Sequence, residues 1–149
     1  MVAERSDNKF VGESSVRSGQ VNPASKGRLW AGRIISALPA LFLLMDGIMK
    51  LVKPAIVVET TVHLGYTESV IAPLGMVLII CTLLYIFPLT SVLGAILLTG
   101  FLGGAVSTHV RAAEGVFPIV FPIIIGALLW LGLYLRDDRL RSLIPWRSV

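Results

Sequence analysis

Residues 90–110 read TSVLGAILLTGFLGGAVSTHV, and this stretch shows most directly how the chain folds. The stretch contains no Asp, Glu, Lys or Arg. Its length matches the ~20 residues that an α-helix needs to cross a ~30 Å hydrocarbon layer. We therefore predict a transmembrane helix here.

Three more apolar segments of similar length occur in the chain, at residues 30–52, 69–87 and 117–135. A lipid-exposed sheet would need a closed barrel with alternating polar and apolar residues, and these segments show no such alternation. The sequence therefore predicts an all-α membrane protein, a four-transmembrane-helix bundle. Residues 1–28 are polar and without apolar periodicity, so we expect a disordered tail. Residues 136–149 form a basic tail.

Composition supports a lipid-facing protein. Of the 149 residues, 55% are hydrophobic and only 15% are charged, which is too few for the shell of a soluble domain. The Lys and Arg residues are scattered outside the apolar segments without aromatic residues between them, which argues against nucleic-acid binding.

The links between the segments predict the topology. Only Phe87, Pro88 and Leu89 separate the second and third segments, so these two form an antiparallel hairpin. The longest link, residues 53–68, is expected to contain an interfacial helical turn. Lys and Arg are frequent in the two tails, and the opposite loops hold only Lys50, Lys53 and Arg111. Cytoplasmic loops are enriched in such residues, so both termini are predicted to be cytoplasmic.

Small residues recur along the third segment. Membrane helices use them for close backbone contact, so we expect this helix to lie centrally and to pack through them. The residues expected to pack are Ser91, Ala95, Thr99, Gly100, Gly103, Gly104 and Ser107.

Two ionisable residues, Asp46 and Lys50, lie inside the first segment and stand one helical turn apart. Charges inside a membrane segment are costly, at about 2.5–3.5 kcal/mol even on lenient scales. The topology brings further polar residues to the same end of the bundle: His109 and Arg111, with Thr108, Glu114, Glu59 and His63 as secondary candidates.

This polar cluster has two interpretations, and the residues alone leave both open. In the structural one, Asp46 pairs with Lys50 or Arg111 and locks the helices, while His109 caps its helix or reaches the interface. In the functional one, the cluster lines a pocket for a polar ligand head group or relays protons.

Several chemistries lack their motifs. No Cys, His or carboxylate spacing typical of a zinc site occurs, and no phosphate-binding glycine loop is present. Two histidines, one of them in a loop, make a haem site improbable. Cys81 is the only cysteine and lies in an apolar run, so no internal disulfide can form.

The chain resembles the DoxX-like membrane family over residues 29–145. The resemblance rests on the runs DGIMKL (46–51), LGY (64–66), GAILLTG (94–100), GGAVSTHVR (103–111) and LYLRD (133–137). It implies a four-helix bundle in a bacterial inner membrane. The wider superfamily is named after a subunit linked to thiosulfate:quinone oxidoreduction, and some relatives are tied to membrane redox and thiol-stress complexes.

The resemblance thus implies a subunit or accessory protein of a quinone-linked redox system, with a membrane partner protein. A quinone would then be the ligand. His109 and Asp46 would handle protons, and Arg111 and Lys50 would hold an oxygen atom. The alternatives are a small permease or channel subunit and a non-catalytic structural partner. Four short helices bury little surface, so a homo-oligomer is also compatible with the sequence.

Overall fold

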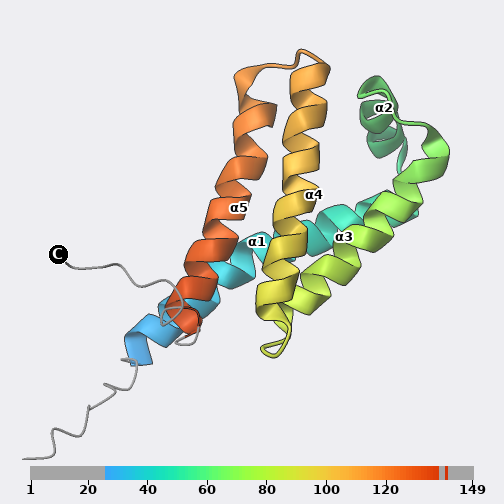
Figure 1. The fold of residues 1–149 in the computed structure, drawn as a ribbon. Coiled ribbons are helices and arrows are strands. Elements are labelled where there is room, and N and C mark those ends of the chain that lie inside the picture. Colours follow the sequence, from blue (N-terminus) through green and yellow to red (C-terminus); the bar gives the residue numbers. More distant parts are fainter. Residues whose placement is uncertain (1–25, 138–139, 141–149) are drawn as a thin grey trace, which may run out of the picture.

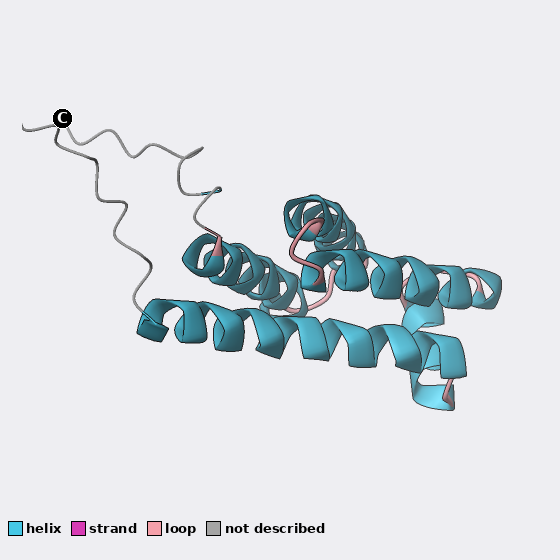
Figure 2. Cartoon of the chain, turned by 90° about the horizontal axis from the view of Figure 1, so that it is seen from below, coloured by secondary structure: helices cyan, strands magenta, loops and turns pink. Residues whose placement is uncertain are grey.

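The computed structural model describes residues 26–137 and Leu140. Within this part of the chain all regular elements are helices (Figures 1 and 2). They are α1 (Lys26–Val52), α2 (Ala55–His63), the 3₁₀ turn η1 (Glu68–Val70), α3 (Ile71–Ile86), α4 (Ser91–Arg111) and α5 (Val116–Arg136). The all-α prediction is confirmed for these residues.

Four of these helices are long and apolar enough to cross a membrane, as predicted: α1, α3 together with η1, α4 and α5. Their ends fall within two residues of the predicted ones, except that α1 begins four residues earlier, at Lys26. Residues 26–28, which were predicted to belong to the tail, are therefore helical, and the rest of the predicted tail lies outside the described residues. Most of the predicted basic tail, residues 138–139 and 141–149, also lies outside them.

The four long helices form a ring in which each packs against two neighbours. Helix α1 packs on α3 and α5, and α4 packs on the same two helices from the other side. Figure 1 shows α4 and α5 side by side, with α1 and α3 slanted across them. Helix α4 is therefore no more central than the others, and the prediction of a central position is wrong.

The two ends of the bundle differ. At one end, which we call the terminal end, α1 begins, α5 ends and α3 turns into α4. Gly32 packs there against Leu135 and Arg136, so the first and last long helices have their outer ends together. The opposite end, the loop end, carries α2, η1 and the α4–α5 link. The assignment of the terminal end to the cytoplasm stays a prediction.

Glycines permit the closest helix contacts, but not the glycines that the sequence pattern indicated. A Cβ atom on Gly75 of α3 would lie 2.7 Å from the Gly47 carbonyl oxygen of α1. Gly132 of α5 lies equally tightly against Ser36 of α1, and Gly94 of α4 against the backbone of Tyr85. These contacts fix three of the four helix pairs at backbone distance.

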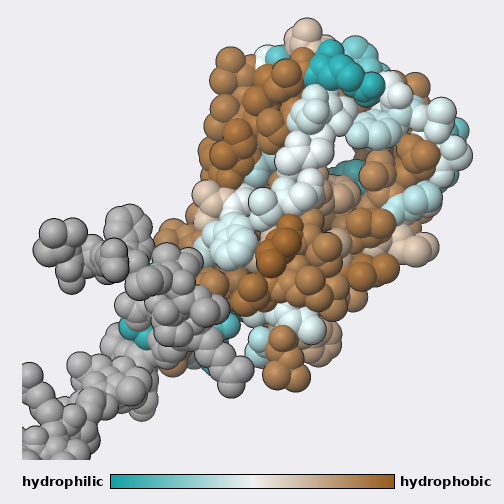
Figure 3. Space-filling view, viewed as in Figure 1, coloured by the Kyte–Doolittle hydropathy of each residue, from teal (hydrophilic) through white to brown (hydrophobic). Residues whose placement is uncertain are grey.

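The small residues of α4 divide between two faces. Ser91 and Ala95 are buried, as expected. The remainder are exposed in this chain: Thr99, Gly100, Gly103, Gly104 and Ser107. A Cβ atom on any of the three glycines would meet no atom of the described chain within 4 Å. The prediction that they pack against other helices of the same chain is therefore wrong. Figure 3 shows a pale stripe, of intermediate hydropathy, over the part of the surface where α4 lies.

The core between the helices is apolar, with one polar anchor. Leu78, Leu98, Leu129 and Leu133 are almost completely buried. Tyr85 is fully buried as well, and its hydroxyl lies 2.8 Å from the Leu129 carbonyl oxygen and 3.0 Å from Ser36 Oγ. Hydrogen bonds that satisfy a buried hydroxyl remove the cost of its burial. Tyr85 thus ties α3 to both α1 and α5.

Candidate functional site

The loop end is built around α2, which folds from the link where an interfacial turn was expected. Pro54 precedes α2, where its fixed φ and missing N–H cost nothing. The chain leaves α2 through Gly65, whose φ of +88° is a left-handed conformation that glycine adopts readily. The link is therefore an ordered helix followed by a tight turn.

Hydrogen bonds fasten this link to the end of α4. The Arg111 guanidinium donates to the Leu64 carbonyl oxygen at 3.0 Å. The Tyr66 hydroxyl lies 2.8 Å from Thr108 Oγ1, and Thr108 in turn donates its only proton to the Gly104 carbonyl oxygen at 2.9 Å. Tyr66 is therefore the donor to Thr108. Two bonds from different residues hold α2 and its turn beside α4.

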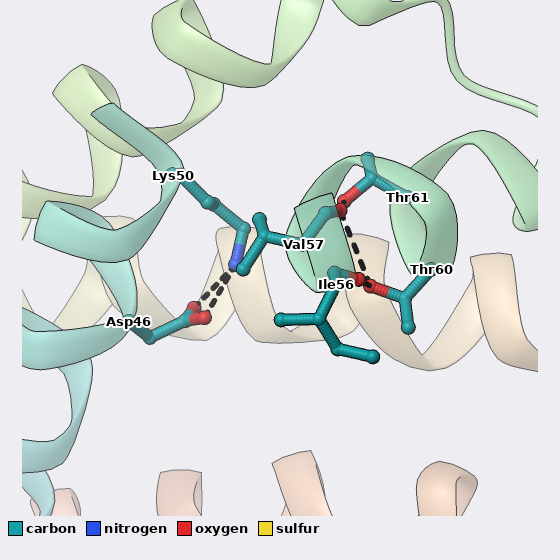
Figure 4. Close-up of polar contacts among 6 residues, drawn as sticks. All are labelled: Asp46, Lys50, Ile56, Val57, Thr60 and Thr61. Carbon is teal, nitrogen blue, oxygen red and sulfur yellow. Dashed lines mark hydrogen bonds and ion pairs between the residues drawn. The ribbon is translucent and has the colours of Figure 1, made fainter. Parts of the chain in front are cut away.

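Asp46 and Lys50 form an ion pair within α1. Lys50 Nζ lies 2.5 Å and 2.6 Å from the two carboxylate oxygens of Asp46. The Lys50 side chain is 18% exposed and the Asp46 side chain is 35% exposed. Figure 4 shows the pair on α1, beside Val57 of α2. Each charge thus has its partner one helical turn away, as the spacing predicted. Of the two partners proposed for Asp46, the structure selects Lys50 and not Arg111.

His109 pairs with Glu114 across the start of the α4–α5 link. His109 Nδ1 lies 2.6 Å from Glu114 Oε2, and both side chains are about three-quarters buried. A short bond between imidazole and carboxylate fixes the ring orientation and leaves Nε2 as the second functional atom of the ring. The interpretation of His109 as a helix cap or an interfacial side chain had not included this carboxylate partner.

A cavity of about 480 Å³ adjoins this pair. It lies between α2 and the α4–α5 link, and its lining residues are Glu59, Thr60, His63, Leu64, His109, Glu114 and Pro118. Figure 3 shows the surface of the loop end, where hydrophilic side chains gather beside α4. Both histidines of the chain and two carboxylates thus border one space.

The structure therefore divides the predicted cluster. His109, Glu114, Glu59 and His63 come together around the cavity. Asp46 and Lys50 pair with each other, and neither they nor Arg111 and Thr108 line this cavity. Three of the four secondary candidates thus line the cavity, whereas His109 is the one primary candidate that does so.

Two contributors were missed by the sequence analysis. Thr60 lines the cavity although its hydroxyl donates to the Ile56 carbonyl oxygen of its own helix. Tyr66 entered the sequence analysis only as part of the run LGY (64–66), yet its hydroxyl binds Thr108 and holds the site together. One sequence signal could have indicated the contribution of α2 to the site. Glu59 and His63 are four residues apart, which puts both side chains on one face of a helix. Among residues 26–137 and Leu140, no three His, Cys, Asp or Glu side chains converge as metal ligands do.

Comparison with known proteins gives one match. The sequence model described as "DoxX-like family" matches residues 34–132, which include the candidate site, α3 and α4 and most of α1 and α5. No curated protein and no solved structure matches the chain.

Proposed function

Since the chain belongs to the DoxX-like family, we propose that it is a quinone-binding subunit of a membrane redox complex, with its ligand site at the loop end. The observation that carries the proposal is the paired His109 and Glu114 at the wall of a cavity of about 480 Å³. A cavity of several hundred Å³ with a few polar groups among apolar ones is typical of small-molecule sites.

The donor chemistry of the lining fits a quinone head group. Quinone carbonyl oxygens only accept hydrogen bonds. His63 supplies an N–H donor to the cavity, and His109 supplies one from Nε2 when its ring is an imidazolium paired with the Glu114 carboxylate. Leu64 and Pro118 provide apolar wall for a ring and for the start of an isoprenoid tail. These four residues come from α2, its turn, α4 and α5, so ligand binding would bridge the link and the bundle.

The remaining residues would manage protons. A bound quinone supplies the redox chemistry, taking up two electrons and two protons on reduction. As an imidazolium whose charge the Glu114 carboxylate stabilises, His109 would donate the proton on Nε2 and become the neutral imidazole. His63 and Glu59 repeat the same pair of residue types on α2. The chain would thus hold and transfer protons, in the role that the sequence had assigned to His109 and Asp46.

The electrons must come from a partner protein. Cys81 is the single cysteine and is buried in the core, so the chain has no thiol pair of its own for electron transfer. The exposed stripe of Gly100, Gly103 and Gly104 supports the subunit part of the proposal, because such stripes allow close approach of a second membrane helix. A protein that serves only as a structural partner would use the same stripe. Measurement of bound quinone distinguishes that role from a quinone-binding subunit.

A permease or channel has less support. A polar solute needs a polar path, and the layer between the two ends is filled by buried leucines: Leu78, Leu98, Leu102, Leu129 and Leu133. Within the described chain this layer separates the loop-end cavity from the terminal end.

The test is to purify the protein in mild detergent, extract it and quantify quinones by mass spectrometry. We expect near-stoichiometric quinone in the wild type. His109→Ala should lower it about tenfold, the effect of one lost charge-assisted hydrogen bond.

Glu68→Gln is the matched control, because Glu68 is an exposed carboxylate at the same end that does not line the cavity. It should retain the wild-type content. A wild-type protein without quinone, also after growth with excess quinone, would overturn the proposal. So would equal loss in the His109→Ala and Glu68→Gln variants.

A further inference from the structure

A second groove lies at the terminal end, away from the proposed quinone site. It is a groove of about 310 Å³ between α1, α3 and α5. Two arginines, Arg33 and Arg136, border it, and its other lining residues are Ser36, Ala37, Ala40, Leu41, Leu44, Tyr85 and Ile86. The groove thus combines two positive charges with a long apolar wall.

Arg136 is held in place by Tyr85. Its guanidinium donates to the Tyr85 carbonyl oxygen at 2.8 Å, and its central carbon lies 4.7 Å from the centre of the Tyr85 ring. A guanidinium has five N–H donors, so donors remain for a ligand. Because Tyr85 is itself locked by Ser36 and Leu129, the position of Arg136 is fixed by the core.

Within residues 26–137 and Leu140, the Arg33 side chain makes no hydrogen bond or ion pair, and it is exposed. Gly32, its neighbour, packs against the backbone of Arg136, which puts both arginines at the same level of the bundle. One arginine is thus fixed, and the other is available beside it.

Helix lengths place this level at the membrane boundary. Helix α5 has 21 residues and is therefore about 30 Å long, close to the hydrocarbon thickness. Arg136 is its last residue, so it stands at the edge of the apolar layer. From there the wall of Ala37, Leu41 and Leu44 runs along α1 into the apolar layer, and Leu41 is exposed toward lipid.

We propose that this groove binds an anionic phospholipid, with the phosphate between Arg33 and Arg136 and an acyl chain along α1. Basic pockets between membrane helices hold anionic head groups in this way, and arginine matches phosphate with paired N–H donors. The groove lining contains no carboxylate. An adjoining cavity shares both arginines but includes Asp137, which disfavours an anion there.

The test uses the full chain in mild detergent, with native mass spectrometry to measure binding of phosphatidylglycerol and of phosphatidylcholine with the same acyl chains. We expect the anionic lipid to bind at least about fivefold more tightly, the effect of about one favourable arginine contact. Arg33→Gln should remove most of that preference.

Two further variants make the test specific. Arg28→Gln removes the same charge at the same end without touching the groove, and it should change the preference less than about twofold. Ala37→Leu fills the exposed apolar wall without changing any charge. It should weaken binding of both lipids, while thermal unfolding shows that each variant stays folded.

Equal binding of the two lipids by the wild type would overturn the proposal, as would equal effects of Arg28→Gln and Arg33→Gln. Displacement of the lipid by millimolar inorganic phosphate, with no effect of Ala37→Leu, would show a site for free phosphate instead. None of these outcomes depends on the loop-end cavity, so the quinone proposal stands or falls separately.

Discussion

Gly47 of α1 and Gly75 of α3 face each other where the two helices cross. A Cβ atom on Gly75 would lie 2.7 Å from the Gly47 carbonyl oxygen and 2.7 Å from Lys50 Cβ. The ion pair of Lys50 with Asp46 therefore sits directly at this crossing. The backbone contact positions the loop-end part of α1 against the helix that follows the α2 turn.

Substitution at this crossing should destabilise the bundle. Gly75→Ala forces the helices apart, and overpacking of this kind costs about 1–3 kcal/mol. Gly100→Ala is the matched control, because a Cβ atom there meets nothing in the described chain. Thermal unfolding in detergent should show a lower midpoint for Gly75→Ala and no decrease for Gly100→Ala. Equal midpoints for the two variants would contradict the crossing described here.

Removing the Tyr85 hydroxyl should loosen the terminal end. Tyr85→Phe leaves the Leu129 carbonyl oxygen and the Ser36 hydroxyl without this partner. Hydrogen bonds between membrane helices contribute about 0.6 kcal/mol each on average, so the two together should cost about 1 kcal/mol. Equilibrium unfolding in mixed detergent measures this difference. A variant as stable as the wild type would show that these bonds contribute nothing to stability.

The Asp46–Lys50 pair should behave as one unit. Asp46→Asn leaves the Lys50 charge, 18% exposed, without its counter-ion, and Lys50→Met leaves Asp46 without its own. We expect the double variant to lose less stability than the sum of the losses in the two single variants. The coupling from a double-mutant cycle should be about 0.5–3 kcal/mol. Strictly additive free energies of unfolding would refute the pairing.

Much of this architecture could be predicted from the sequence, because membrane segments follow from length and polarity alone. The four spans and the antiparallel α3–α4 hairpin needed no knowledge of packing. Side-chain spacing within one helix was also sufficient for Asp46 and Lys50. These features are local, and local geometry is what a sequence specifies most directly.

The contacts between elements could not be predicted in the same way. A stripe of small residues marks a face that permits close approach, but it does not say whether the partner is in the same chain. Gly100, Gly103 and Gly104 therefore suggested a central α4, whereas isolated glycines such as Gly47 and Gly75 make the contact. That His63 lines the same cavity as His109 depends on how α2 folds back, which no single segment encodes.

The most direct test of the central claim is to titrate a decyl-substituted benzoquinone into protein freed of bound lipid and to measure its dissociation constant. The proposed site predicts that His109→Ala and Glu114→Gln each weaken binding about tenfold, because both side chains line the cavity, whereas Asp46→Asn leaves it unchanged. The opposite pattern, a loss in Asp46→Asn with wild-type affinity in His109→Ala, would contradict a quinone site in this cavity and would return the Asp46–Lys50 pair to the centre of the function.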